Sequence, residues 1–189
     1  MARVSDGRAL PGISSARTDL RAIARDLVLP LVLGALAIAL IRAWKMPVQL
    51  PGHQGVIWMA ALVAARLVSR SRLGATVGGV GAFAVGMLPP AEASQALGIL
   101  AAGIVLDAAS SLRSLATPLL WSIGMGAIGN AVVLLAKLAL GDLPRAIIRE
   151  GVGFGLETYL AFGALGGLCV GLGALAVSYR ECVLPRRRA

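Results

Sequence analysis

The chain has 189 residues, of which 58% are hydrophobic and only 14% are charged. A soluble domain of this size has too much surface for its volume to bury so large an apolar fraction. The net charge is +9, but the arginines flank apolar segments and form no basic stripe with interleaved aromatic residues, which argues against nucleic-acid binding. These features predict an integral membrane protein in a lipid bilayer.

Six apolar runs follow one another along the chain, and several of them approach the roughly 20 residues that a helix needs to cross a bilayer. Glycine and alanine abound in them, which favours closely packed helices over a barrel of alternating strands. We expect an all-α membrane bundle of about six transmembrane helices. The runs are Leu27–Ile41, Val56–Val68, Leu73–Leu88, Ala93–Ala109, Ala116–Leu140 and Phe154–Val177.

The distribution of positive charge predicts the orientation. Thirteen of the 18 Lys and Arg residues fall on one side of the six runs, and four fall on the other. Because cytoplasmic loops are enriched in Lys and Arg, this bias predicts that both termini lie on the cytoplasmic side of the cell membrane. The domain limits follow: a flexible cytoplasmic tail over 1–16, the membrane domain over 17–180 and a basic cytoplasmic tail over 181–189. The connections 44–58, 89–95 and 141–153 would then lie outside.

The first of these outer connections, Trp44–Trp58, is unusually polar and stiff for a segment between two apolar runs. Its prolines, Pro47 and Pro51, restrict the backbone, whereas Gly52 and Gly55 allow tight turning. Such a segment could cap a small polar ligand, although a solvated loop histidine is the alternative interpretation of the sole histidine. The candidate ligand contacts here are Gln49, His53, Gln54 and Trp58.

Polar residues within the apolar runs are informative, because they are costly in a bilayer unless they are paired or hydrated. Asn130, Lys137 and Glu157 are all expected near the outer ends of the last two runs, with Lys137 and Glu157 within about two helical turns of the same surface. Tyr159 could stack on a ligand or belong to an aromatic belt. We expect either a polar pocket beneath the outer connections or a snorkelling lysine and an interfacial carboxylate.

Motifs for catalysis are not found in the sequence. There is no HExxH, GxSxG or GxxxxGK[ST] pattern, and one histidine cannot build a metal centre alone. We therefore expect no catalytic residues, no metal, no cofactor and no enzymatic activity, and the chain cannot itself use ATP.

The pattern resembles the substrate-binding S components of energy-coupling factor (ECF) transporters over about residues 20–180. Those are six-helix membrane proteins of similar size with both termini inside. The resemblance implies uptake of a vitamin or similar metabolite together with a transmembrane coupling subunit and two cytoplasmic ATPases. It implies that Ala35 and Ala39 dock the coupling subunit, and that the loop containing Pro51–Gly55 covers the ligand. Substitution of His53 or Glu157 by alanine should then weaken binding.

Two other classes fit the composition. A structural protein similar to the rod-shape-determining six-helix proteins would have its informative residues on helix faces or cytoplasmic loops and would not need a stiff outer loop. A stand-alone carrier or a permease subunit would need charged residues deeper in the bilayer for ion coupling.

Overall fold

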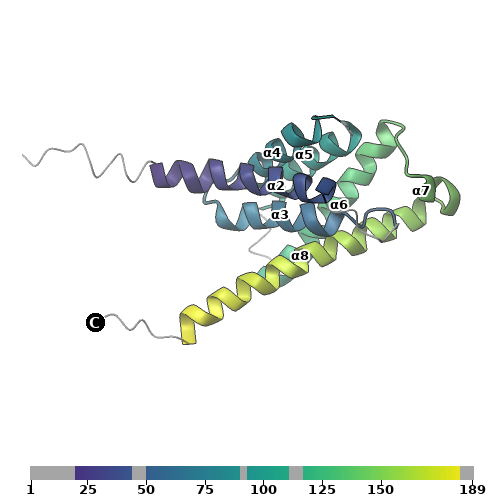
Figure 1. Ribbon diagram of the computed structural model, residues 1–189. Helices are drawn as coiled ribbons and strands as arrows, with labels where there is room; N and C mark the ends of the chain where they lie inside the picture. Colours follow the sequence, from purple (N-terminus) through teal and green to yellow (C-terminus); the bar gives the residue numbers. More distant parts are fainter. Residues whose placement is uncertain (1–19, 44–49, 90–92, 111–116, 184–189) are drawn as a thin grey trace, which may run out of the picture.

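The computed structural model describes residues 20–43, 50–89, 93–110 and 117–183, and all regular structure within those ranges is helical (Figure 1). The prediction of an all-α protein is therefore confirmed for this part of the chain. The six predicted runs and the short polar segment after Pro144 correspond to helices. In chain order the elements are η1 (Ala24–Val28), α2 (Leu29–Ala43), α3 (Gly55–Val68), α4 (Gly74–Gly86), α5 (Ala93–Ala108), α6 (Pro118–Ala139), α7 (Arg145–Glu150) and α8 (Val152–Val183).

Three helical segments of the described chain are long and apolar enough to cross a membrane. They are Leu20–Ala43, Pro118–Ala139 and Val152–Tyr179. The helices α3, α4 and α5 have 14, 13 and 16 residues, which is short of the roughly 20 residues of a typical span. The structure is thus compatible with a membrane protein, whereas the number of spans and the orientation stay predictions.

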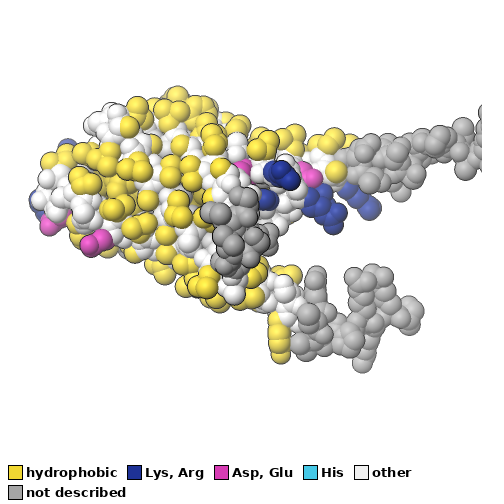
Figure 2. Space-filling model, turned by 180° about the vertical axis from the view of Figure 1, so that it is seen from behind, with side chains coloured by type: hydrophobic (Ala, Val, Ile, Leu, Met, Phe, Trp, Pro, Cys, Tyr) yellow, Lys and Arg dark blue, Asp and Glu magenta, His cyan; other side chains and the backbone are white. Residues whose placement is uncertain are grey.

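The outer surface of the bundle is rich in exposed apolar side chains. Leu36, Leu120 and Leu135 are each about 60% exposed, at 60%, 62% and 59%. Figure 2 shows a broad apolar surface between the two ends of the molecule, with Lys and Arg gathered near the end where the described chain begins. A bilayer would cover such a surface without the cost of exposing it to water.

Helix α3 lies at the centre of the bundle. It packs against α2, α4, α5, α6 and α8, and its side chains Trp58, Met59, Leu62 and Val63 are buried. Helix α6 packs along α8, and Figure 1 shows α8 crossing the bundle obliquely before its C-terminal half leaves it. Helix α3 is therefore held by its neighbours, and the candidate site lies at its first turn.

Glycines bring two helix pairs into backbone contact. A Cβ added at Gly34 of α2 would overlap the carbonyl oxygen of Gly78 in α4, and one added at Gly126 of α6 would overlap the carbonyl oxygen of Gly163 in α8. Small residues at such crossings let dispersion contacts form between backbones. This close packing fixes the distances between the helices that carry the site.

A π-helical turn precedes Pro30 in the first helical segment. The N–H of Leu29 bonds to the carbonyl oxygen of Ala24, five residues back. Pro30 has no N–H, and its ring would clash with a regular helical carbonyl one turn earlier. The wider turn over Ala24–Val28 accommodates the buried proline while the helix continues from Leu20 to Ala43.

One end of the bundle is fastened by two carboxylates. Asp26 accepts hydrogen bonds from the backbone N–H of Arg70 at 2.8 Å and from Ser69 Oγ at 3.3 Å. Asp107 accepts from the N–H groups of Ala75 and Thr76 at 3.1 and 2.6 Å, so it caps the N-terminus of α4. The bonds of Asp26 join η1 to the residues that follow α3, and those of Asp107 join the end of α5 to the start of α4.

Candidate functional site

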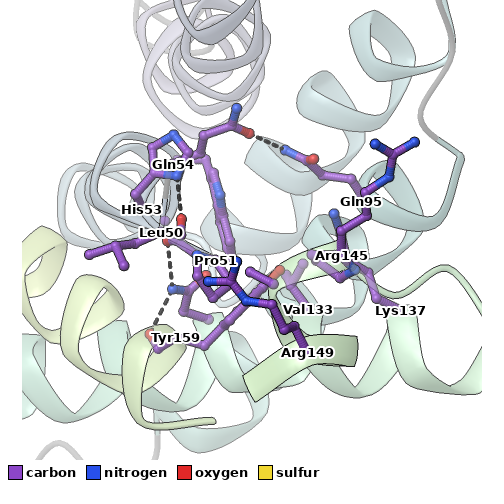
Figure 3. Close-up of a pocket in the computed structure, with 16 residues that line it drawn as sticks. Leu50, Pro51, His53, Gln54, Gln95, Val133, Lys137, Arg145, Arg149 and Tyr159 are labelled. Carbon is purple, nitrogen blue, oxygen red and sulfur yellow. Dashed lines mark hydrogen bonds between the residues drawn. The ribbon is translucent and has the colours of Figure 1, made fainter. Parts of the chain in front are cut away.

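A cavity of about 630 Å³ lies at the opposite end of the bundle, where α3 and α5 begin and α6 ends (Figure 3). Its walls come from the turn over 50–54, the first turn of α3, Gln95 of α5, α6, residues 144–149 and Tyr159 of α8. Residues from all three of the connections predicted to share one side therefore lie at the same end of the bundle. A cavity of this size is in the range that holds small-molecule ligands.

The turn that covers one side of the cavity depends on two glycines. Gly52 has φ +79, a left-handed conformation, and a Cβ there would lie 2.7 Å from Tyr159 Cδ2 and 3.0 Å from Tyr159 Cα. Gly55 begins α3 with ordinary helical geometry, but a Cβ on it would collide with the side-chain amide of Asn130. Both glycines thus permit close docking of the turn on α6 and α8, and Gly52 also supplies the left-handed backbone of the turn.

Asn130 holds this arrangement together from α6. Its side chain is fully buried, and Nδ2 donates to the carbonyl oxygens of Gly52 at 3.3 Å and Tyr159 at 2.6 Å. Both amide hydrogens therefore have acceptors, which defines the orientation of the amide. Its Oδ1 is buried without a hydrogen-bond partner in the described chain, so an acceptor is left over in a residue that lines the cavity.

Polar side chains also join the connections to one another. Gln54 Oε1 accepts a hydrogen bond from Gln95 Nε2 at 3.1 Å, across the cavity between the α2–α3 turn and α5. Ser94 Oγ donates to Asp142 Oδ2, which links α5 to the segment after α6. His53 Nδ1 lies 2.5 Å from the carbonyl oxygen of Leu50, so this nitrogen donates within the turn.

Three cationic side chains line the same cavity. Lys137 comes from the last turn of α6, and Arg145 and Arg149 lie one turn apart on α7. From the sequence, Arg145 and Arg149 contribute only to the charge distribution that predicts the orientation in the membrane. Their spacing of four residues in a short helix directly after the Gly141–Pro144 turn is the signal that could have placed both on one face. Gln95, by contrast, has no local signal.

The cavity brings together six of the eight residues that the sequence singled out for ligand binding: His53, Gln54, Trp58, Asn130, Lys137 and Tyr159. Gln49 lies outside the described residues. Glu157 is exposed on α8, does not line the cavity, and forms no ion pair with Lys137 within the described chain. Ligand binding by any of these residues stays a prediction.

The surface expected to dock a coupling subunit lies on α2. Ala39 is exposed and Ala35 is half-buried, whereas Gly34 on the inward face packs against α4. Docking of a partner at these alanines is a prediction of the resemblance alone.

The residues described by the structure contain no group of three or more His, Cys, Asp or Glu side chains that could hold a metal ion. No protein-family model, curated protein or solved structure matches the chain.

Proposed function

We propose that this protein is a membrane-embedded substrate-binding subunit for uptake of a small metabolite, similar in role to the S components of ECF transporters. The observation that carries the proposal is the cavity of about 630 Å³ at one end of an apolar helical bundle, partly covered by the Pro51–Gly55 turn. Capture requires a site that is largely preformed, apolar in its walls and equipped with a few convergent polar groups.

The lining supports binding of an amphipathic molecule. Trp58 and Tyr159 are packed behind the cavity wall at 2% and 3% exposure, so they shape its base and offer little surface of their own. Gln54, Gln95 and His53 supply donors and acceptors on the side formed by the turn and α5. In the proposed cycle the metabolite binds under the turn, and a coupling subunit with two ATPases then drives its release on the other side of the membrane. Ala35 and Ala39 would face that subunit.

The test is a binding screen of the purified protein in detergent, read by thermal shift and then by calorimetry. The panel is thiamine and its pyrimidine precursor, riboflavin, biotin, folate, cobalamin, pantothenate, nicotinate and queuosine-type nucleosides. The proposal expects one class to bind with a Kd below about 1 μM, which corresponds to about 8 kcal/mol of binding free energy. Absence of binding across the whole panel would count against uptake and favour a structural membrane protein.

The location of the site is tested by two matched variants. His53→Ala removes a half-buried side chain that lines the cavity and is expected to weaken binding about fivefold, since a hydrogen bond contributes about 1 kcal/mol. Glu157→Gln changes an exposed side chain two residues from Tyr159 that does not line the cavity, so, in contrast to the expectation from the sequence, it should bind as the wild type does. Equal effects of the two variants would contradict the site.

A further inference from the structure

The cavity carries charge of one sign. Lys137, Arg145 and Arg149 line it, and none of the lining residues is an Asp or Glu. Lys137 and Arg145 form no ion pair within the described chain, whose three ion pairs all involve other residues. Like charges brought together around a partly enclosed space repel one another, and they are favoured when an anion enters between them.

The nearby carboxylates Asp142, Glu150 and Glu157 lie outside the cavity lining. Asp142 accepts a hydrogen bond from Ser94 and does not line the cavity. Glu150 pairs with Arg149 at 2.7 Å, but the two side chains are 44% and 82% exposed, so the pair is weak and screened by salt. The charged side chains that line the cavity are therefore all cationic, and the half-buried Lys137 is the least exposed of them.

The positions of the cations along the chain point the same way. This end of the bundle carries the connections that have few Lys and Arg residues. Of the four cations described there, Arg42 donates to the carbonyl oxygens of Gly86 and Leu88 at 2.8 and 3.0 Å and so satisfies the end of α4. The other three, Lys137, Arg145 and Arg149, all line the cavity.

We propose that the cavity binds a small water-soluble anion, whose carboxylate or phosphate group is held by Lys137, Arg145 and Arg149. Lys137 comes from α6 and both arginines from α7, and Figure 3 shows Lys137 and Arg145 on the side of the cavity away from His53, with Arg149 below them. The uncharged part of the ligand would lie against the turn, where His53 and Gln54 are half-buried and line the cavity. This inference rests on the proposed function and names the class of substrate.

The experiment compares acids with neutral partners of the same shape on the purified full-length protein in zwitterionic detergent. The pairs are nicotinate with nicotinamide, pantothenate with pantothenol, biotin with biotinamide, and pyridoxal phosphate with pyridoxal. The anionic member of at least one pair is expected to bind at least tenfold more tightly than its partner. Its affinity should fall as salt is raised from about 0.05 to 0.5 M, because these partly exposed cations are screened.

Charge-removing variants test which cations hold the anion. Lys137→Gln and Arg145→Gln are each expected to weaken binding of the anionic probe about tenfold or more, and binding of its neutral partner by less than twofold. Arg72→Gln is the matched control, because Arg72 is an exposed cation at the opposite end of the bundle and makes no described hydrogen bond. It removes the same charge from the molecule and should leave affinity unchanged.

Three results would overturn the anion site, and they differ in whether substrate binding itself is also refuted. Neutral members that bind as tightly as their acids would refute the anion site and leave substrate binding intact. No binding by any member of any pair, or by the wider vitamin panel, would remove both proposals. Stabilisation by phosphatidylglycerol in phosphatidylcholine nanodiscs, lost in Lys137→Gln and accompanied by no binding of soluble anions, would show that the cations hold a lipid headgroup.

Discussion

Replacement of Gly52 by alanine tests whether docking of the turn depends on close approach as well as on backbone conformation. Gly52 and Gly141 both have left-handed backbones, with φ +79 and φ +69. Alanine in this conformation costs about 1 kcal/mol at either site. The difference lies in their surroundings, because a Cβ at Gly141 meets nothing within 4 Å, whereas one at Gly52 meets the ring and backbone of Tyr159.

The extra cost at Gly52 follows from these contacts. Tyr159 Cα would lie 3.0 Å from the new methyl group, and a backbone atom of a packed helix cannot move aside as the end of a side chain can. The turn must therefore shift, which breaks the 3.3 Å hydrogen bond from Asn130 Nδ2 to Gly52 and leaves a buried donor unsatisfied. Loss of that bond adds about 1–3 kcal/mol. We expect a total of about 3 kcal/mol for Gly52→Ala and about 1 kcal/mol for Gly141→Ala.

The assay is thermal unfolding in detergent, followed by the fluorescence of the buried Trp58 and Trp121. A loss of 1 kcal/mol lowers the Tm of a chain of this size by about 2–4 °C. The Tm of Gly52→Ala should therefore fall by about 6–12 °C, and that of Gly141→Ala by about 2–4 °C. Equal falls in the two variants would refute the close docking of the turn on Tyr159.

The remaining predictions concern packing and capping, and each is measured by the same unfolding assay. Gly126→Ala should lower stability by about 1–3 kcal/mol because its methyl group would overlap the carbonyl oxygen of Gly163, whereas Gly124→Ala, with nothing within 4 Å, should raise stability by about 0.5–1 kcal/mol. A similar change in both variants would contradict the α6–α8 crossing. Asp107→Ala should cost about 2–4 kcal/mol through loss of the α4 cap and of its 3.4 Å ion pair with Arg66, and Asp107→Asn about half as much, since an amide oxygen still accepts one bond. An effect below 0.5 kcal/mol in Asp107→Ala would show that the cap is not needed.

The positions of the helices could be predicted because apolar runs and their breakers are local features of the sequence. Pro118 begins α6, with Thr117 as its N-cap, and the turn at Gly141 follows its end. Helix α8 extends to Val183, beyond the domain limit at residue 180, because its last turns continue into polar sequence without a glycine or proline to stop them. The number of membrane spans could not be settled in this way, because helices of 13 to 16 residues serve both buried and spanning roles.

The site was only partly predictable, for a different reason. Asn130 and Lys137 are conspicuous because they interrupt an apolar run, and both line the cavity. Gln95 lies at the start of an apolar run and Arg149 in a short polar segment, and only the packing of α5 and α7 beside the turn brings them to the cavity. Glu157 interrupts an apolar run as Lys137 does, but its position on α8 turns it to the outside.

In a bilayer, the unequal lengths of the helices would have a consequence for the surrounding lipid. At about 1.5 Å per residue, the 13 and 16 residues of α4 and α5 span about 20–24 Å, whereas the 32 residues of α8 span about 48 Å. Helix α8 packs against α3 and α6 and not against the α4–α5 pair. A bilayer with a hydrocarbon core of about 30 Å would therefore be thinned beside α4 and α5, and α8 would tilt or project from it. Acyl-chain length should then change the stability of this protein, with short-chain lipids favoured along the α4–α5 side.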